Sequence, residues 1–171
     1  VVYRPNDENG FREINQTGLE CIGDIDTAAV CEVISLAIKS LQLLSKNYLL
    51  NISHNGFLLG VLSEIDVDSD IKDKIINAVS QKNTAVINDI CNNNNIDKRI
   101  SDILEQLCLI YEPINSALEK IKPLVLNEQM ADAYNELFEI NSSLQKTEMN
   151  KRVMIDFSTL NDMSYYNGII F

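Results

Sequence analysis

The sequence has few basic residues: 14 lysines and arginines stand against 25 aspartates and glutamates, a formal net charge of −11 over 171 residues. A chain this acidic repels the phosphate backbone of DNA and RNA, so we expect no nucleic-acid-binding surface. No apolar run approaches the length of a membrane span, so we expect no membrane partner. The first ten residues lack the apolar core of a signal peptide, which favours a cytoplasmic location.

Several chemical signatures are also missing. The cysteines, Cys21, Cys31, Cys91 and Cys108, follow no zinc-ligand spacing, and Cys31 and Cys108 stand at apolar helical positions typical of buried thiols. No glycine-rich phosphate loop is present. The single histidine, His54, has no nucleophile in a recognisable pattern and is expected to be structural. We therefore expect neither a metal nor a cofactor. The chain does not begin with methionine, and we expect a fragment of a longer protein.

Hydrophobic residues make up 46% of the chain, enough for the core of one ordinary domain. Residues 1–5 and 11–23 are predicted to form an antiparallel strand pair around the turn 6–10. Apolar residues three and four apart predict a helix over 24–46, with Asp24 or Asp26 as its cap. A strand over 47–53 and a short helix over 54–65 follow.

The remainder is mostly helical in pattern. Short amphipathic segments occupy 69–122, and we expect them to form a helical insertion within a single 1–171 unit. A longer helix is predicted over 127–147. Two strands, 152–160 and 165–171, are expected to form a hairpin joined by residues 161–164. This order predicts an α+β domain whose antiparallel sheet carries helices on one face.

Strand alternation would place Arg12, Gln16 and Glu20 on one face, with Gly18 leaving space between them. A cation, an amide and a carboxylate in a row match the charges of a small zwitterion. The alternative is an exposed sheet face with ordinary cross-strand pairs, which is the more common situation for such a pattern.

The adjacent tyrosines Tyr165 and Tyr166 stand near the start of the last predicted strand. Neighbouring strand residues face opposite sides, so one phenol at most can line a given pocket. The alternative for either is core or interface packing with its hydroxyl hydrogen-bonded.

Three stretches together carry a family resemblance. "YRPNDENGFREINQTGLECIGD", residues 3–24, resembles the second signature motif of class II aminoacyl-tRNA synthetases in its histidyl form. "MIDFSTLNDMSYYNGIIF", residues 154–171, resembles the histidine-specific motif that ends in Tyr-Tyr-x-Gly-x-x-Phe. "NISHNGFLLGVL", residues 51–62, resembles the strand-to-helix turn between them. The resemblance covers about residues 3–65 and 125–171, and implies a partial class II core: an antiparallel sheet flanked by helices, with the middle helices as the family's insertion.

The resemblance assigns roles position by position. Arg4 matches the arginine that touches the α-phosphate of ATP. Gln16 and Glu20 match the pair that holds the ammonium group of the amino acid. Tyr166 matches the tyrosine that lines the histidine side-chain pocket, with Tyr165 behind it. With Arg12, these are the candidate residues of a histidine-like ligand pocket.

The motif also departs from the synthetase pattern. Asn161 stands four residues before Tyr165, where the synthetases have an arginine that stabilises charge during adenylate formation. Asn6 stands where they have a glutamate, and the turn is shorter. Losing one preorganised donor costs about 2.7–4 kcal/mol of transition-state stabilisation. We therefore expect no catalytic residue here.

A histidyl-type core without that arginine resembles the regulatory subunits of ATP phosphoribosyltransferase. The resemblance implies a non-catalytic subunit that joins a short-form catalytic subunit in a hetero-oligomer, activates the first step of histidine biosynthesis and mediates histidine feedback inhibition. It also implies self-association and a pocket for histidine. Two alternatives remain open: a divergent histidyl-tRNA synthetase core that obtains an arginine from elsewhere, and a dimerisation module without a ligand.

Overall fold

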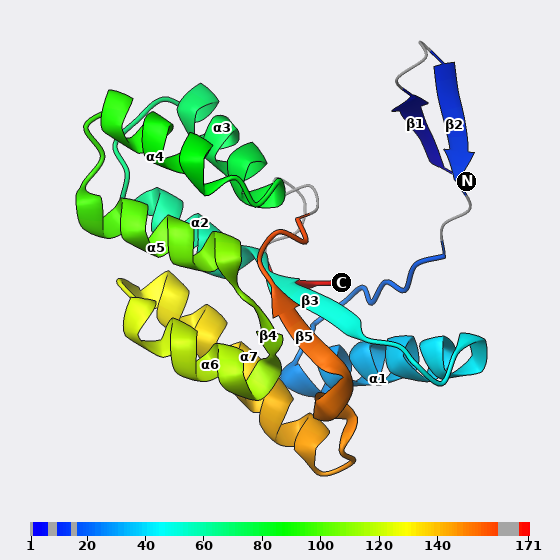
Figure 1. The fold of residues 1–171 in the computed structure, drawn as a ribbon. Helices are drawn as coiled ribbons and strands as arrows, with labels where there is room; N and C mark the ends of the chain where they lie inside the picture. Colours follow the sequence, from blue (N-terminus) through cyan, green and yellow to red (C-terminus); the bar gives the residue numbers. More distant parts are fainter. Residues whose placement is uncertain (1, 7–9, 15–16, 161–167) are drawn as a thin grey trace.

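The computed structural model describes residues 2–6, 10–14, 17–160 and 168–171, with the backbone alone for 2–6, 10–12 and 14. Figure 1 shows a small hairpin set apart from a helix-rich body. The described strands are β1 (Val2–Asn6), β2 (Gly10–Ile14), β3 (Leu50–His54), β4 (Tyr111–Pro113), β5 (Val153–Asp156) and β6 (Ile169–Ile170). The α-helices are α1 (Thr27–Leu44), α2 (Asn55–Ser63), α3 (Ser69–Ser80), α4 (Thr84–Asn93), α5 (Lys98–Leu109), α6 (Ile114–Ile121) and α7 (Glu128–Gln145), with 3₁₀ turns at Lys122–Leu124 and Met149–Arg152.

The N-terminal hairpin is confirmed, but its second strand is shorter than predicted. β1 and β2 pair antiparallel from Val2↔Ile14 to Asn6↔Gly10. Residues 17–26 contain no strand and are exposed throughout. The prediction of one strand over 11–23 is therefore wrong for residues 17–23. The last pair of this hairpin among the described residues is Val2↔Ile14.

The central sheet has four strands in the order β4-β5-β3-β6. β3 lies parallel to β5 and antiparallel to β6, while β4 is antiparallel to β5. The α+β class is confirmed, but the sheet is mixed, and the predicted hairpin between the last two strands is wrong because β3 separates β5 from β6. Helices α2–α7 connect β3 to β5, and a long helical crossover brings the chain back in the same direction, which a tight turn cannot do.

Side chains at the N-termini explain where the main helices begin. Asp26 rather than Asp24 caps α1, accepting a hydrogen bond from the Ala29 amide at 2.8 Å. At the end of β3, His54 caps α2, its Nδ1 accepting from the Gly56 amide at 3.1 Å. Each cap satisfies one amide that has no partner within its own helix.

The core lies where α2 crosses α7. Seven of the nine residues of α2 are buried, and the Phe57 ring lies 5.5 Å from that of Phe157. Gly60 allows the close approach, because a Cβ there would lie 2.5 Å from Cγ of Met130. Asn127 caps α7 through Met130 and also donates to the Gly60 carbonyl at 2.9 Å. One side chain thus joins the start of α7 to the last turn of α2.

The helical segment 69–122 includes a piece of the central sheet. Helices α3, α4 and α5 pack on one another, whereas β4 pairs with β5. From the turn between α3 and α4, Lys82 reaches Asp156 of β5 at 3.0 Å and lies 5.0 Å from the centre of the Tyr111 ring. That 69–122 is an insertion stays a prediction.

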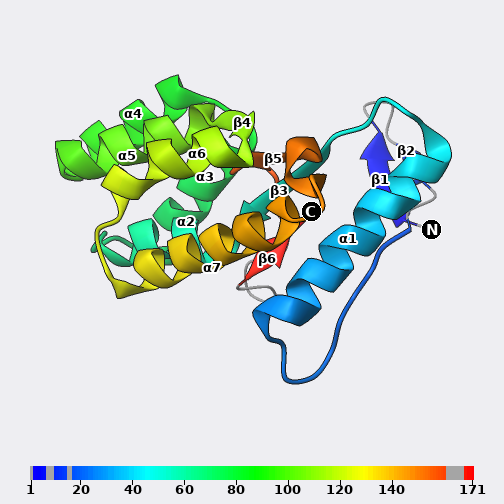
Figure 2. The same ribbon diagram turned by 90° about the horizontal axis from the view of Figure 1, so that it is seen from below.

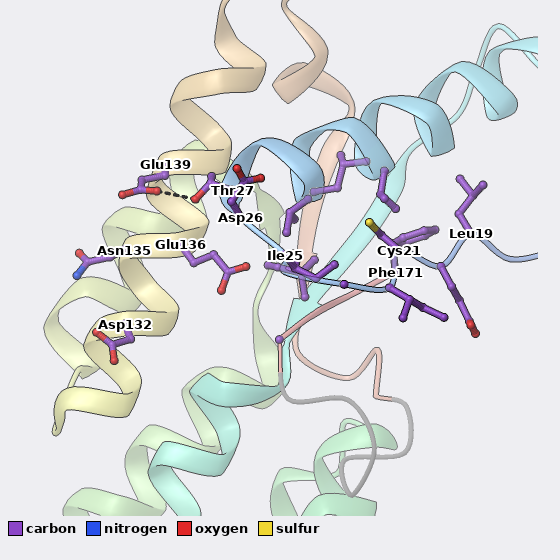
Figure 3. A pocket seen from close by; sticks show the side chains of 18 residues that line it. Leu19, Cys21, Ile25, Asp26, Thr27, Asp132, Asn135, Glu136, Glu139 and Phe171 are labelled. Carbon is purple, nitrogen blue, oxygen red and sulfur yellow. Dashed lines mark hydrogen bonds between the residues drawn. The ribbon is translucent and has the colours of Figure 1, made fainter.

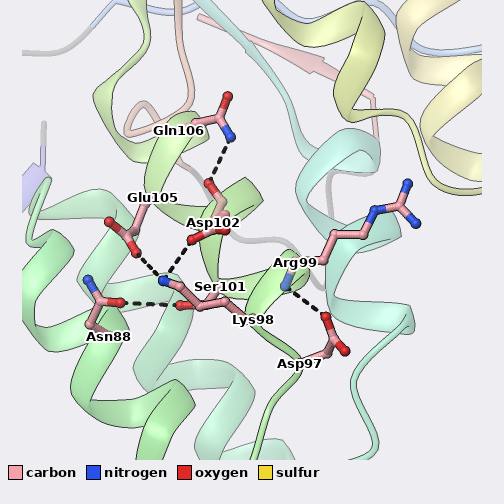
Figure 4. A network of polar contacts seen from close by, with 8 residues as sticks. All are labelled: Asn88, Asp97, Lys98, Arg99, Ser101, Asp102, Glu105 and Gln106. Atoms are coloured by element: carbon pink, nitrogen blue, oxygen red, sulfur yellow. Dashed lines mark hydrogen bonds and ion pairs between the residues drawn. The ribbon is translucent and has the colours of Figure 1, made fainter.

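The outer surface of this segment is polar. Figure 4 shows Lys98 at the start of α5 paired with Asp102 at 2.7 Å and close to Glu105. The Asp102 hydrogen bond raises the pKa of the Lys98 ammonium. Below this surface, burial raises the pKa of the Cys91 and Cys108 thiols, so both remain protonated at neutral pH, as expected for packing residues.

Among the described residues, α1 is the one helix long and apolar enough to cross a membrane by length and composition. The expectation that no segment approaches this length is therefore wrong. Two charges, Glu32 and Lys39, interrupt the apolar run without shortening the helix. One helix of this length and composition does not by itself indicate a membrane protein, and one side of α1 packs against α7. The absence of a membrane partner stays a prediction.

Candidate functional site

A cleft of about 890 Å³ opens between α1, α7 and the last described residues of the chain. Figure 3 shows its walls: residues 19–27 lead into α1 on one side, α7 lies opposite, and Phe171 closes the third side. Apolar side chains from residues 19–25, from α1 and from the last described residues form much of the lining, among them Ile25, Val30 and Ile169. Asp26 caps α1 and so fixes where the helix begins, which places Ile25 and Asp26 on the side of the cleft that faces α7.

The polar part of the lining is acidic. The described lining holds no lysine or arginine. It holds five carboxylates: Glu20, Asp26, Asp132, Glu136 and Glu139. Thr27 donates to Glu139 at 2.8 Å and so ties the first turn of α1 to α7. The cleft therefore presents a negative potential to solvent and favours a ligand that carries a positive charge.

His54, at the end of β3, contacts one of these carboxylates. Its Nδ1 accepts the Gly56 amide hydrogen, so the ring proton lies on Nε2, which donates to Glu136 at 3.0 Å. The ring is buried while Glu136 is partly exposed. This bond holds one carboxylate in place and leaves its other oxygen as an acceptor. That His54 has a structural role stays a prediction.

Chemically, the cleft combines an apolar wall with carboxylates that bind an ammonium or imidazolium group. Among the described residues, no group of three or more histidine, cysteine, aspartate or glutamate side chains has the geometry to hold a metal ion. The lining of the cleft thus suits an organic cation.

The predicted site residues fall in three places. Glu20 lines the cleft, although in a segment without regular structure rather than on a strand. Arg4 and Arg12 are direct backbone partners across the β1–β2 hairpin. Gln16, Tyr165, Tyr166 and Asn161 lie outside the described residues. The strand-face argument that grouped Gln16, Gly18 and Glu20 fails for Gly18 and Glu20, because residues 17–26 contain no strand. Glu20 is the one predicted ligand residue with a described place in the cleft.

The acids of α7 were missed from the sequence. Asp132, Glu136 and Glu139 are spaced by four and three residues, so they share one side of the helix next to its apolar side. The apolar residues of this segment predicted the helix, but its acids were not assigned to a site. The charged stripe was visible, but a stripe of acids is usually a solvated helix surface, and only its position opposite residues 19–27 distinguishes this one.

Comparison with known proteins identifies the fold family. The family model for histidyl-tRNA synthetase matches residues 1–171. The chain belongs to this family. The histidyl-type resemblance of the two motifs is thereby confirmed over the full length of the chain.

Several curated proteins similar to this chain are described as regulatory subunits of ATP phosphoribosyltransferase. The ATP phosphoribosyltransferase regulatory subunit of Oceanobacillus iheyensis is 26% identical over 99% of this chain and 42% of its own length. Those of Clostridium kluyveri and Halothermothrix orenii are 28% and 30% identical, over 99% and 94% of this chain and 44% and 38% of their own lengths. The chain thus spans less than half of each of these relatives.

Solved structures show the same fold. An ATP phosphoribosyltransferase regulatory subunit/histidyl-tRNA synthetase from Bacillus halodurans superposes with a TM-score of 0.74 at 22% identity, over 86% of this chain and 39% of that one. The ATP phosphoribosyl transferase (HisG:HisZ) complex from Thermotoga maritima gives 0.66 at 24% identity, over 86% and 51%. For this histidyl-tRNA synthetase-like chain, these superpositions confirm the α+β core.

Proposed function

We propose that this chain is part of a regulatory subunit of ATP phosphoribosyltransferase, which activates the first step of histidine biosynthesis and mediates its inhibition by histidine. The observation that carries the proposal is the shared description of the curated relatives, each matched over 94% or more of this chain. The presence of Asn161 at the position of the synthetase arginine supports a role without adenylate formation. The subunit itself would be non-catalytic.

The ligand of this proposal is histidine, recognised by charge. Glu20 together with Glu136 gives carboxylates for an ammonium group, and the apolar wall of the cleft accommodates a small side chain. Arg4, Arg12, Gln16, Tyr165 and Tyr166 are proposed to complete the pocket on the basis of the motif alone. The proposed partners are the short-form catalytic subunit and a further copy of the regulatory subunit, in the cytoplasm.

A second function is favoured by one observation. The family model that matches the whole chain is that of histidyl-tRNA synthetase, and the Bacillus halodurans protein of similar fold is described both as a regulatory subunit and as a histidyl-tRNA synthetase. In this alternative the protein activates histidine with ATP, and an arginine from another part of the molecule replaces the one absent at Asn161.

The decisive experiment mixes the complete protein with the short catalytic subunit from the same source and follows phosphoribosyl-ATP formation. We expect activity well above that of the catalytic subunit alone, and suppression of it by histidine. A mixture no more active than the catalytic subunit would overturn the proposal. Histidine-dependent exchange of pyrophosphate into ATP by the protein alone would favour the synthetase instead.

Histidine binding is measured separately by thermal unfolding. A ligand present at 100 times its dissociation constant adds about 2.7 kcal/mol to the free energy of unfolding. Glu20→Gln removes one carboxylate of the cleft and is expected to reduce this gain, whereas Glu119→Gln on the exposed surface of α6 serves as the control with the same change of charge. If histidine raised the free energy of unfolding equally in both variants, Glu20 would not be part of the histidine site.

A further inference from the structure

A second groove, of about 400 Å³, lies at the end of α1 away from the cleft. Its lining comes from residues 42–48, where α1 ends, and from residues 147–152, which follow α7. Figure 2 shows the chain turning back at this end of α1 toward β3, with the turn after α7 beside its path. Because α1 is about 27 Å long, this groove is separate from the cleft. Its volume is in the range of small-molecule sites.

The groove offers positive charge on a chain whose net charge is −11. Lys46 and Arg152 line it, one from each segment, and neither pairs with a carboxylate among the described residues. The described lining holds one carboxylate, Glu148, which accepts a hydrogen bond from Lys151 at 2.6 Å. This hydrogen bond lowers the pKa of Glu148, so the carboxylate is ionised and its charge is offset by Lys151. Both cations of the lining are therefore available to an anion.

The Arg152 side chain is oriented by Tyr48. Its guanidinium carbon lies over the tyrosine ring, 5.2 Å from the ring centre. A guanidinium placed over an aromatic face still has the N–H groups at its edge to donate. The Tyr48 hydroxyl accepts a hydrogen bond from Gln42 at 2.8 Å, and no described residue accepts its own hydrogen. The groove thus combines a preorganised fork of donors, an ammonium group and a phenol donor.

The ends of two helices give a simpler explanation for the two cations. α1 ends at Leu44 and α7 ends at Gln145, and the C-terminal end of a helix attracts positive charge. That attraction needs only a nearby charge. It does not account for a guanidinium oriented by an aromatic ring or for a hydroxyl hydrogen directed to no described acceptor. Those two features are typical of a binding site for an anion with several oxygens.

We propose that this groove binds the phosphate group of a small organic phosphate monoester. Arg152 donates two hydrogen bonds to the phosphate oxygens, Lys46 pairs with their charge, and the Tyr48 hydroxyl donates a further bond. Met149 lines the same groove and contacts the organic part of the ligand. Because both cations are exposed and screened by salt, we expect a dissociation constant on the order of a millimolar at low ionic strength. The proposal is independent of the proposed function, because it uses no residue of the cleft.

The test is isothermal titration calorimetry of the complete protein with glycerol 3-phosphate and with inorganic phosphate. We expect saturable binding of both, weaker in added sodium chloride, with glycerol 3-phosphate bound more tightly because only it has an organic part. Arg152→Gln should weaken binding of both about tenfold, the equivalent of one charge-assisted hydrogen bond. Lys74→Gln, at an exposed position on α3, makes the same change in net charge and should bind like the parent.

Two further variants separate geometry from charge. Arg152→Lys keeps the charge and loses the planar fork, so its affinity should lie between those of the parent and of Arg152→Gln. Tyr48→Phe keeps the ring beneath Arg152 and loses the hydroxyl, so it should bind glycerol 3-phosphate several-fold more weakly than the parent. The circular dichroism spectrum of each Arg152 variant should match that of the parent, because the side chain is exposed.

Four results would overturn the proposal. The first is a parent protein with no saturable binding of either phosphate. The second is parent-like affinity in Arg152→Gln, and the third is a Lys74→Gln variant weakened as much as Arg152→Gln, which is the result of unspecific attraction by charge. The fourth is equal affinity for the two phosphates, which would assign the groove to free phosphate instead of a monoester.

Discussion

Helices α1 and α2 have similar apolar sequences and opposite environments. α2 buries seven of its nine residues beneath α7, while α1 buries three of eighteen. The difference lies in what surrounds each helix. α2 directly follows β3 and is enclosed by α7 and Phe157, whereas α1 touches the body along one narrow side. Apolar composition therefore measures how much surface a helix can bury and does not show how much it buries.

The largest contrast is expected from truncating one side chain in each helix. Phe57→Ala removes a fully buried ring from α2 and should lower the free energy of unfolding by about 3–5 kcal/mol. Urea unfolding followed by circular dichroism measures the change, and Phe57→Leu serves as the milder variant if the first does not fold. A loss below 1 kcal/mol would show that α2 is not enclosed.

The crossing of α2 and α7 is tested at Gly60. Alanine favours a helix over glycine by about 1 kcal/mol, but the added Cβ would meet Met130 and the Asn127 side chain. The steric clash is expected to cost more than the gain in helix propensity, so Gly60→Ala should lower the free energy of unfolding by about 1–2 kcal/mol. Gly18→Ala, where nothing lies within 4 Å of the new Cβ, is the control and should change stability by less than about 0.5 kcal/mol.

Asn127 is expected to contribute more than an ordinary helix cap. Asn127→Ala loses the bond to Met130 and also the link to the Gly60 carbonyl, with an expected cost of about 1–2 kcal/mol. Asn83→Ala, which loses a cap of α4 through Val86, provides the comparison. Equal costs in thermal unfolding would mean that the link between α2 and α7 adds nothing.

The smallest effect is expected on the outer side of α1. Leu43→Gln exchanges an almost fully exposed side chain, so the free energy of unfolding should change by less than about 0.5 kcal/mol. A large loss of stability would mean that α1 packs within its own chain through this side.

The candidate site was only partly predictable. Glu20 was identified by its motif, and it does line the cleft, but it lies in a segment without a strand, so the alternation used to group it with Gln16 does not apply to it. The acids of α7 escaped notice because charged helix stripes are common and usually only solvated. A site assembled from segments more than a hundred residues apart, such as Thr27 and Glu139, leaves no local pattern in a sequence.

The positions of the main helices, the turn of the first hairpin, the acidic character and the family could be predicted from the amino-acid sequence, because caps, apolar spacing and motifs are local features. The sequence did not determine the strand order β4-β5-β3-β6, which separates the last two strands and makes the sheet mixed. Tertiary structure also decided that α2 is enclosed and α1 exposed. Both outcomes depend on contacts between distant segments, and burial in such contacts is a property of the assembled chain rather than of any stretch of it.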